Sequence, residues 1–400
     1  MTGAADDDPS GIATYTVVGA RFGTSLLWTA LLTWPLMAAV QMMCARVGMV
    51  TGAGLIDALR HRFPRPVILL FVFSLLLANT INVGADLAGM ADAAELFTGL
   101  DSHICVVLFG IATAWATIRL RYSQIARTLK WLTLVLLAYI VAAFQLGPDW
   151  GAVLRATVLP TLPGGSAQWA GLVAILGTTI SPYLFFWQAS QEVEEEKAMG
   201  RRVLDARVGA AVEELQTRAA DIGLGTLFSN VVMYFIILTA ALTLHAHGVT
   251  TVETSREASL ALRPLAGPLA AGLYAFGVLG VGLLAIPTLT ASAAYAISEA
   301  FDWPQGLDEG WSGAPAFYSI VLVSTLGGVA LDFLNFQPVT ALVWSAVING
   351  ALAPFLLLGI LIVASDRALM HGQTSSRLGQ GVVLAAMILM WAALAGMVLL

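Results

Sequence analysis

The sequence predicts an all-α protein that crosses a membrane many times, and three observations lead to that prediction. Hydrophobic residues make up 58% of the 400 residues and charged residues only 11%, whereas a soluble chain carries about 25% charged residues. The mean hydropathy is +0.83. The few charges are also spaced so that long uncharged runs separate them. This composition excludes a soluble enzyme, and a net charge of −6 offers no basic face for nucleic acid.

The uncharged runs predict the helices in order. A membrane-spanning helix needs about 20 residues that are nearly all uncharged. Ten runs of sufficient length lie at 22–45, 66–85, 102–118, 131–148, 156–191, 222–252, 264–298, 310–331, 333–365 and 378–400. An eleventh, at 9–20, reaches only roughly 18 Å as a helix and is too short for a hydrocarbon core of about 30 Å. We therefore expect a half helix followed by ten spans, and the length of the runs excludes barrel strands.

The basic residues predict the orientation. Fifteen of the 19 Lys and Arg residues fall in the loops that follow the second, fourth, sixth and tenth helices, counting the half helix as the first. Because cytoplasmic loops are enriched in Lys and Arg, these loops are expected inside. Cys44 and Cys105 then lie at opposite ends of their helices and are not expected to form a disulfide. The charged segment 192–221 is expected to be a cytoplasmic amphipathic helix.

Two proline-containing stretches predict broken helices. In Asp8-Pro9-Ser10-Gly11, a carboxylate next to backbone carbonyls freed by proline would suit a hard cation. The same residues are also typical of a helix N-cap followed by proline at the first helical position, so both interpretations stay open. The second stretch, Gly177-Thr-Thr-Ile-Ser-Pro-Tyr183, places proline in the middle of the sixth helix. Matching breaks in two sets of helices are typical of the central site of a transporter.

These breaks divide the helices into two sets of five, and an odd number forces the second set to be inverted in the membrane. We expect one transmembrane transport domain over residues 1–400. Its first repeat covers about 1–148, its second about 166–365, and a final helix covers about 378–400. Helices one and six are the broken ones.

Both stretches resemble the NRAMP family (natural resistance-associated macrophage proteins), which are secondary transporters of divalent metals. Asp8-Pro9-Ser10-Gly11-Ile12-Ala13-Thr14 is similar to the family's Asp-Pro-Gly-Asn-Ile-Ala-Thr, and Gly177–Tyr183 occupies the place of a sixth-helix stretch that ends Met-Pro-His. The resemblance, to a divergent bacterial-type branch, implies a leucine-transporter-like inverted repeat and a multi-pass protein of the cell membrane, in bacteria the inner membrane. It implies a divalent cation as transported substrate and the lipid bilayer as surroundings, with no enzyme activity and no cofactor. It indicates no protein partner.

The resemblance also implies a set of site residues. Asp8 matches the family's metal-binding Asp, Gly11 stands where the family has Asn, Thr178 would offer a carbonyl, and Ser181 stands where the family has Met. Access or outer positions are expected at Asp6, Asp7, Tyr183, Asp86 and Asn349. Because Ser181 replaces a thioether, we expect a preference for harder cations such as Mg²⁺ or Mn²⁺ over Cd²⁺.

Two departures from the family concern the coupling of metal transport to protons and the start of the chain. The stretch 79–83 is uncharged where the family has acids linked to proton movement, and Gln188 stands where the family has a second His. We therefore expect a metal flux that a proton gradient does not strongly drive. The family carries about a half helix before the Asp-Pro motif, whereas seven residues precede Asp8 here. A form with an upstream apolar half helix is expected to transport better.

Two other functions are compatible with parts of this pattern. The same fold could transport a small organic ion such as an amino acid, since half-helix N-termini bind carboxylates, although the acidic cluster at Asp8 would repel an anion. An intramembrane aspartyl protease would need two Asp residues that share a proton. For that function Asp86 lacks a partner, because no second Asp is expected at the same depth in a full span.

Overall fold

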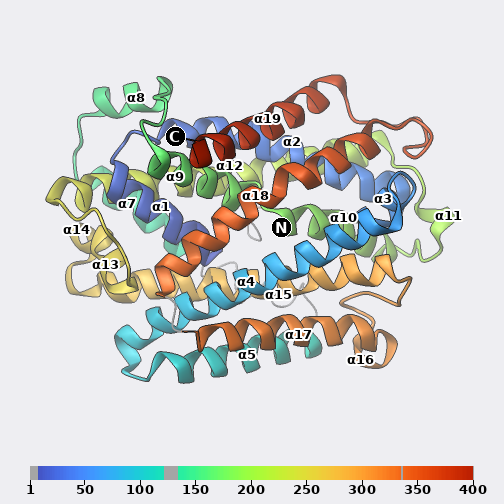
Figure 1. The fold of residues 1–400 in the computed structure, drawn as a ribbon, viewed down its shortest axis with the longest axis horizontal. Coiled ribbons are helices and arrows are strands. Elements are labelled where there is room, and N and C mark those ends of the chain that lie inside the picture. Colours follow the sequence, from blue (N-terminus) through green and yellow to red (C-terminus); the bar gives the residue numbers. More distant parts are fainter. Residues whose placement is uncertain (1–7, 121–133, 335–336, 400) are drawn as a thin grey trace.

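The computed structural model describes residues 8–120, 134–334 and 337–399, and within them every regular element is helical (Figure 1). The long helices run roughly parallel to the long axis of the molecule in this view. They are α2 (Trp28–Thr51), α4 (Arg65–Thr98), α5 (Ser102–Arg119), α12 (Val212–Thr243), α15 (Ala270–Ala300), α17 (Pro315–Asp332), α18 (Pro338–Ser365) and α19 (Arg377–Leu399), with α9 (Ser166–Thr179) and α10 (Pro182–Ala198) as two halves of a broken helix.

Nine of the ten expected spans are confirmed among the described residues as helices long and apolar enough to cross a membrane. The remaining one, expected over 131–148, begins at residues that lie outside the described part. What the structure describes of it is a short 3-10 turn, η2 (Leu134–Leu137), followed by α7 (Ala138–Gln145). The expected half helix is α1 (Pro9–Phe22).

The connections carry short helices at the two ends of the bundle. Figure 1 shows α8 (Trp150–Val158), α13 (Ser255–Ser259) and α14 (Arg263–Ala266) at one end. At the other end lie α3 (Leu55–Arg60), α11 (Leu204–Arg207) and α16 (Gly310–Gly313). The short turns η3 (His245–His247), η4 (Leu260–Leu262) and η5 (Gly267–Leu269) complete the described elements. The end with α3 holds the loops rich in Lys and Arg and is called the inner end below.

One prediction about these connections is wrong. The segment 192–221 is not a single amphipathic helix, because α10 continues to Ala198, α11 occupies four residues, and α12 begins at Val212. Gly200 and Gly209 have φ angles of 94° and 87°, a region that glycine adopts without steric cost and that ends a helix. The charged residues of this segment therefore face one another across a turn.

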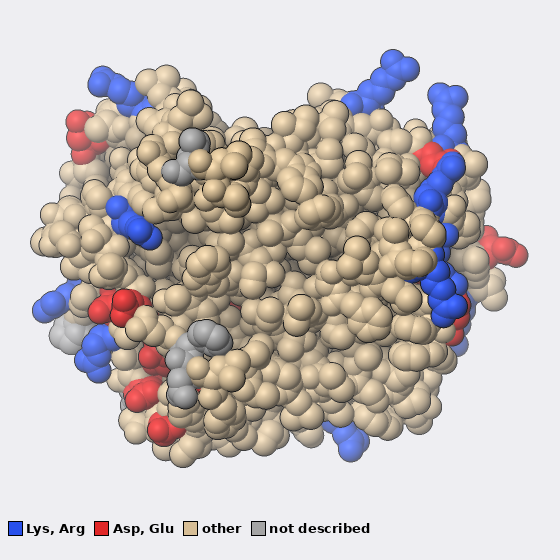
Figure 2. All heavy atoms as spheres, in the orientation of Figure 1, with Lys and Arg blue, Asp and Glu red and all other residues tan. Residues whose placement is uncertain are grey.

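The surface agrees with a multi-pass membrane protein. Figure 2 shows most Lys, Arg, Asp and Glu side chains towards the two ends of the long axis, with a wide uncharged surface between them. Leucines on the long helices are well exposed, for example Leu70 of α4 and Leu326 of α17 at 64% each. Large exposed apolar areas on a chain of this composition are what a lipid-facing surface requires. Cys44 and Cys105 are both buried and free, as expected.

Small residues let helices approach one another closely near α1, which packs against α12, α18, α9, α4 and α15. The tightest crossing is between α9 and α18. A Cβ atom on Gly177 would lie 1.9 Å from the Ala346 carbonyl oxygen and 2.4 Å from the Gly350 nitrogen, both of them backbone atoms. Glycine at such a crossing allows backbone-to-backbone contact between membrane helices.

Replacing Gly177 by alanine is expected to lower the thermal midpoint of the purified protein, because α9 and α18 must separate to make room. Overpacking of this kind costs about 1–3 kcal/mol. Gly381→Ala is the matched control, since nothing lies within 4 Å of a Cβ at that helical position. Equal midpoints for the Gly177→Ala variant and the wild type, measured in detergent, would contradict this account of the crossing.

Candidate functional site

Asp8 begins α1 and is almost completely buried, at 1% exposure. Its Oδ1 accepts a hydrogen bond from the Gly11 backbone N–H at 2.8 Å and one from Ser10 Oγ at 2.6 Å. Asp8 is therefore the N-cap of α1, with Pro9 at the first helical position. Its second oxygen, Oδ2, faces α4, where Asn82 Nδ2 donates to it at 3.3 Å. One carboxylate oxygen thus caps the helix, and the other points towards the neighbouring helices.

The second break lies between α9 and α10. Ile180 and Ser181 leave the helical region, and Pro182 restarts the helix because its fixed φ suits the first helical position. Ser181 Oγ lies 2.8 Å from the Gly177 carbonyl oxygen and 2.7 Å from that of Thr178. The Ser181 hydroxyl therefore caps the end of α9, and the Thr178 carbonyl already accepts a hydrogen bond from it.

The two breaks meet at Gly11 and Thr178. A Cβ atom on Gly11 would lie 3.2 Å from Thr178 Oγ1 and 3.6 Å from Asp8 Oδ1. The Thr178 side chain also interacts with the Asp8 carboxylate. Thr178 Oγ1 is buried and makes no hydrogen bond of normal geometry with the described residues. A buried hydroxyl without a partner is costly, so this position would gain from a cation or an ordered water.

Asp86 on α4 is a stronger candidate than the sequence indicated. It is fully buried, the charge of Asp8 acts on it, and its carboxylate interacts with the Ser10 backbone, although neither oxygen makes a hydrogen bond of normal geometry with a described residue. It follows Asn82 by one helical turn, so both side chains face α1. The uncharged stretch 79–83 therefore does not leave the site without carboxyl groups, and Asn82 within it contacts Asp8. The Asp that acts on Asp86 caps the half helix α1 and does not belong to a full span.

Sequence reasoning missed Asn82 and Ser10, both of which bind Asp8 directly. The spacing of Asn82 and Asp86, four residues apart in an otherwise uncharged run, was the available signal. Ser10 directly follows Pro9 at the first break. Its hydroxyl was detectable as a short polar group next to an N-cap.

The remaining predicted residues lie around this centre or outside the description. Asn349 on α18 is 1% exposed, and both of its side-chain polar atoms lack a hydrogen bond to any described residue. It adjoins Gly350, which touches α9 at Gly177. Tyr183 is completely buried in the first turn of α10. Asp6 and Asp7 lie outside the described residues.

Together these groups form a buried, oxygen-rich centre. Carboxylates come from Asp8 and Asp86, a hydroxyl from Thr178, and an amide oxygen from Asn82, which has no hydrogen bond within the described ranges. Carboxylate, hydroxyl and carbonyl oxygens are the donors that Mg²⁺, Ca²⁺ and Mn²⁺ prefer. The donor set fits a hard divalent cation, and it contains no sulfur.

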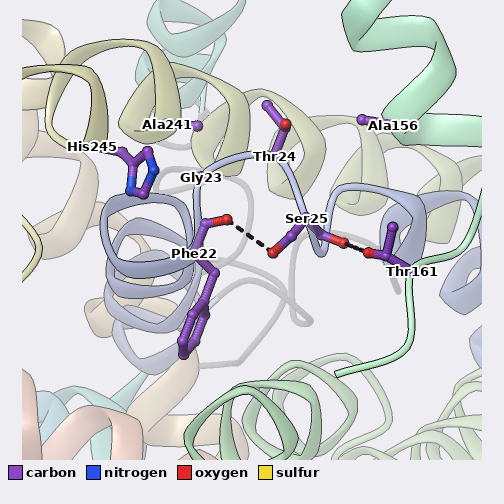
Figure 3. Close-up of a pocket in the computed structure, with 8 residues that line it drawn as sticks. All are labelled: Phe22, Gly23, Thr24, Ser25, Ala156, Thr161, Ala241 and His245. Carbon is purple, nitrogen blue, oxygen red and sulfur yellow. Dashed lines mark hydrogen bonds between the residues drawn. The ribbon is translucent and has the colours of Figure 1, made fainter. Parts of the chain in front are cut away.

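A pocket of about 360 Å³ lies at the other end of α1 from Asp8, opposite α3, where α1 joins α2 (Figure 3). His245 Nδ1 lies 2.9 Å from the Ala20 carbonyl oxygen. Since a carbonyl only accepts, Nδ1 donates. Ser25 Oγ donates to the Phe22 carbonyl, and Thr161 Oγ1 donates to that of Ser25. These bonds fix the turn after α1, so we assign the pocket residues to holding α1 in place.

The chain matches a known family model and is similar to bacterial metal transporters. A model of the family described as natural resistance-associated macrophage protein-like matches residues 1–400. The chain is 29% identical over 284 residues to the divalent metal cation transporter MntH of Yersinia pestis (strain Pestoides F), a match that covers 69% of this chain but only 65% of that protein. It is 26% identical over 383 residues to MntH of Klebsiella pneumoniae subsp. pneumoniae, covering 94% and 86%.

Solved structures share the fold at low sequence identity. The manganese transporter of Eremococcus coleocola superimposes with a TM-score of 0.70 at 18% identity, over 98% of this chain and 83% of that one. MhsT in complex with L-phenylalanine gives 0.58 at 16% identity, over 99% and 97%. The leucine-transporter-like fold that the family resemblance implied is confirmed.

Proposed function

The chain belongs to the natural resistance-associated macrophage protein-like family, and from that premise we propose that it carries divalent metal cations across a membrane. The bacterial relatives are named divalent metal cation transporters, and one of the similar solved structures is a manganese transporter. The observation that carries the proposal is the buried carboxylate of Asp8 at one helix break, which interacts with the buried side chain of Thr178 at the other.

In this proposal the ion sits between the two breaks. Asp8 supplies the main charge, and Thr178 supplies a hydroxyl. Gly11 leaves the space that a side chain would fill, and Ser181 fixes the end of α9 and offers oxygen lone pairs. Asp86 and Asn349 complete the surroundings, with water filling the rest of the shell, as Mg²⁺ and Mn²⁺ tolerate. Asp6, Asp7 and Tyr183 belong to the access route.

The wider setting of the proposal follows the family. The cargo is a divalent ion of the Mn²⁺, Mg²⁺ or Fe²⁺ class, and the protein lies in the cell membrane, in bacteria the inner membrane, with lipid around it. The transport domain comprises a first repeat over about 1–148 and a second over about 166–365. The helix over about 378–400 is then added outside the repeats.

An organic anion is disfavoured as cargo by the same residues. MhsT shares the fold and its structure holds L-phenylalanine, so the fold alone does not decide. Asp8 and Asp86 place two carboxylates at the break, and both would repel the carboxylate of an amino acid. Proximity of two Asp side chains also meets one requirement of an aspartyl protease, but the family and the relatives are transporters.

Transport by purified protein in sealed vesicles tests the proposal. The account expects saturable uptake of Mn²⁺ or Mg²⁺ that exceeds uptake by protein-free vesicles, and no uptake of labelled phenylalanine. Uptake of phenylalanine without any uptake in a panel of Mn²⁺, Mg²⁺ and Fe²⁺ would overturn it. Uptake measured with and without an imposed proton gradient, and with an uncoupler, tests the separate expectation of weak proton coupling.

Replacing Ser181 by methionine is expected to strengthen Cd²⁺ binding at least about tenfold, while Mg²⁺ binding weakens. The change brings a thioether to the break, and soft sulfur ligands favour thiophilic metals. It also frees the Thr178 carbonyl, which Ser181 Oγ approaches at 2.7 Å. Isothermal titration of both ions measures the effect, with Thr178→Val as the companion variant that should weaken both. Tight Cd²⁺ binding by the wild type would refute the role given to Ser181.

A further inference from the structure

A second polar region lies at the inner end, in a cavity of about 900 Å³ between α10, α12 and their neighbours. Its lining includes eight acidic residues and two basic ones. A cavity wall with such an excess of negative charge raises the local concentration of cations. Its wall includes Gln188, Glu192, Glu195, Glu196, Arg218 and Asp221.

The cavity wall continues from the candidate metal site along one face of α10. Ser181 precedes the first residue of this helix, and Gln188, Glu192 and Glu195 follow at spacings of seven, four and three residues. These spacings place them on one helical face. At about 1.5 Å per residue, Glu192 lies roughly 16 Å from Ser181 along the helix axis. The face therefore leads from the second break towards the inner end.

Arg218 of α12 holds the carboxylates of this face. Its Nε lies 2.7 Å from Glu192 Oε1, its Nη1 lies 3.3 Å from Asp221 Oδ2, and its Nη2 bonds Glu195. Gln188 Nε2 donates to Glu192 Oε1 at 2.6 Å. The Glu192 side chain is 3% exposed and that of Arg218 is 19% exposed. The Arg218 guanidinium thus occupies the place that a metal cation would take among the buried carboxylate oxygens.

Glu196 adds a buried carboxylate that forms a long ion pair with Arg201 but accepts no hydrogen bond from a described residue. It lines the same cavity one helical turn beyond Glu192 and is 5% exposed. Neither of its carboxylate oxygens has a hydrogen bond to a described residue. The Nη1 atom of Arg201 is 3.8 Å away, beyond hydrogen-bonding distance, and its Nη2 bonds Glu214 at 2.6 Å. A buried carboxylate with open lone pairs beside the Arg218 cluster indicates room for a mobile cation.

We propose that Glu192, Glu195 and Glu196 form a transit site for divalent cations between the central site and the inner side, and that Arg218 is a tethered cation that competes for it. The proposal rests on the proposed function. Conduction requires sites that attract an ion but release it again. While Arg218 engages Glu192 and Glu195, no three acidic, His or Cys side chains among the described residues are placed to hold an ion. An arriving ion displaces Arg218, and the returning guanidinium helps to expel it.

Mn²⁺ titration of the full chain tests this, with Asp8→Asn as background to remove the central site. The Asp8→Asn single variant is expected to show no Mn²⁺ binding. Adding Arg218→Gln is expected to create one Mn²⁺ site, at least about tenfold tighter than the weakest binding that the titration can detect. Adding Glu192→Gln as a third change should remove that site. Arg202→Gln is the matched control, because it removes an exposed inner-end charge that makes none of these bonds.

No Mn²⁺ site in folded Asp8→Asn/Arg218→Gln protein, or a site that survives Glu192→Gln, overturns the inference. If the Arg218→Gln variant does not fold, Arg218→Met keeps the apolar stem and carries the same expectation. Wild-type flux together with an absent transit site would contradict this inference alone. Absence of both wild-type binding and wild-type flux would instead contradict the proposed function.

Discussion

Asp8→Asn protein is expected to bind no divalent metal and to show flux no greater than protein-free vesicles. Asparagine keeps an oxygen that can accept the Gly11 N–H, so the cap on α1 persists while the charge is lost. A divalent ion then faces only neutral oxygens in a buried site, and its desolvation is no longer compensated. Isothermal titration and vesicle flux with Mn²⁺ measure the two effects. Asp8→Ala should lose the cap as well and cost about 1 kcal/mol in stability.

Asp149→Asn is the matched control for this change. Asp149 is also a helix N-cap, accepting from the Gly151 and Ala152 backbone N–H groups at 2.9 and 3.2 Å, but it is exposed at the start of α8. Its replacement should leave binding and flux unchanged. Flux that remained at the wild-type level in Asp8→Asn vesicles would remove Asp8 from the site.

Asp86→Asn is expected to weaken Mn²⁺ binding at least about tenfold, which corresponds to about 1.4 kcal/mol. Two buried carboxylates that act on each other are unfavourable without a cation, and a divalent ion near both is stabilised by both. Asn has the same shape but contributes no charge, so the change tests charge rather than packing. Titration of Mn²⁺ into the purified variant measures the effect.

Asp92→Asn provides the comparison on the same helix. Asp92 lies near the far end of α4, where its Oδ2 accepts from the Ser255 backbone N–H at 2.6 Å. The Asp92→Asn change should therefore leave Mn²⁺ binding unchanged. If Asp86→Asn and Asp92→Asn bound Mn²⁺ as tightly as the wild type does, Asp86 would be only a structural neighbour of Asp8.

The helices were predictable because a bilayer imposes a length and an absence of charge that single segments display on their own. Pro9 and Pro182 likewise predict the two helix breaks from the local sequence alone, since proline restricts the backbone wherever it stands. The end of α10 was harder to predict. Residues 192–221 have helical composition throughout, and only the positive φ angles of Gly200 and Gly209 divide them.

Contacts between distant elements were beyond the sequence. Asn82 reaches Asp8 across 74 positions of the chain. The spacing of Asn82 and Asp86 marks a polar face of α4 but does not reveal which helix that face meets. The orientation of Ser181 is a second example. The resemblance placed its hydroxyl at the ion, whereas the structure shows it donating to the carbonyls that end α9. Which side chain faces a site is decided by the packing of several helices together.

The location of bound Mn²⁺ in crystals of the full chain tests the central claim most directly. Anomalous scattering at the manganese edge marks the ion without reliance on neighbouring density. The account predicts a peak between the Asp8 carboxylate and the Thr178 hydroxyl, absent in Asp8→Asn crystals grown in the same Mn²⁺ concentration. A strong peak elsewhere, with none between the two helix breaks, would contradict it.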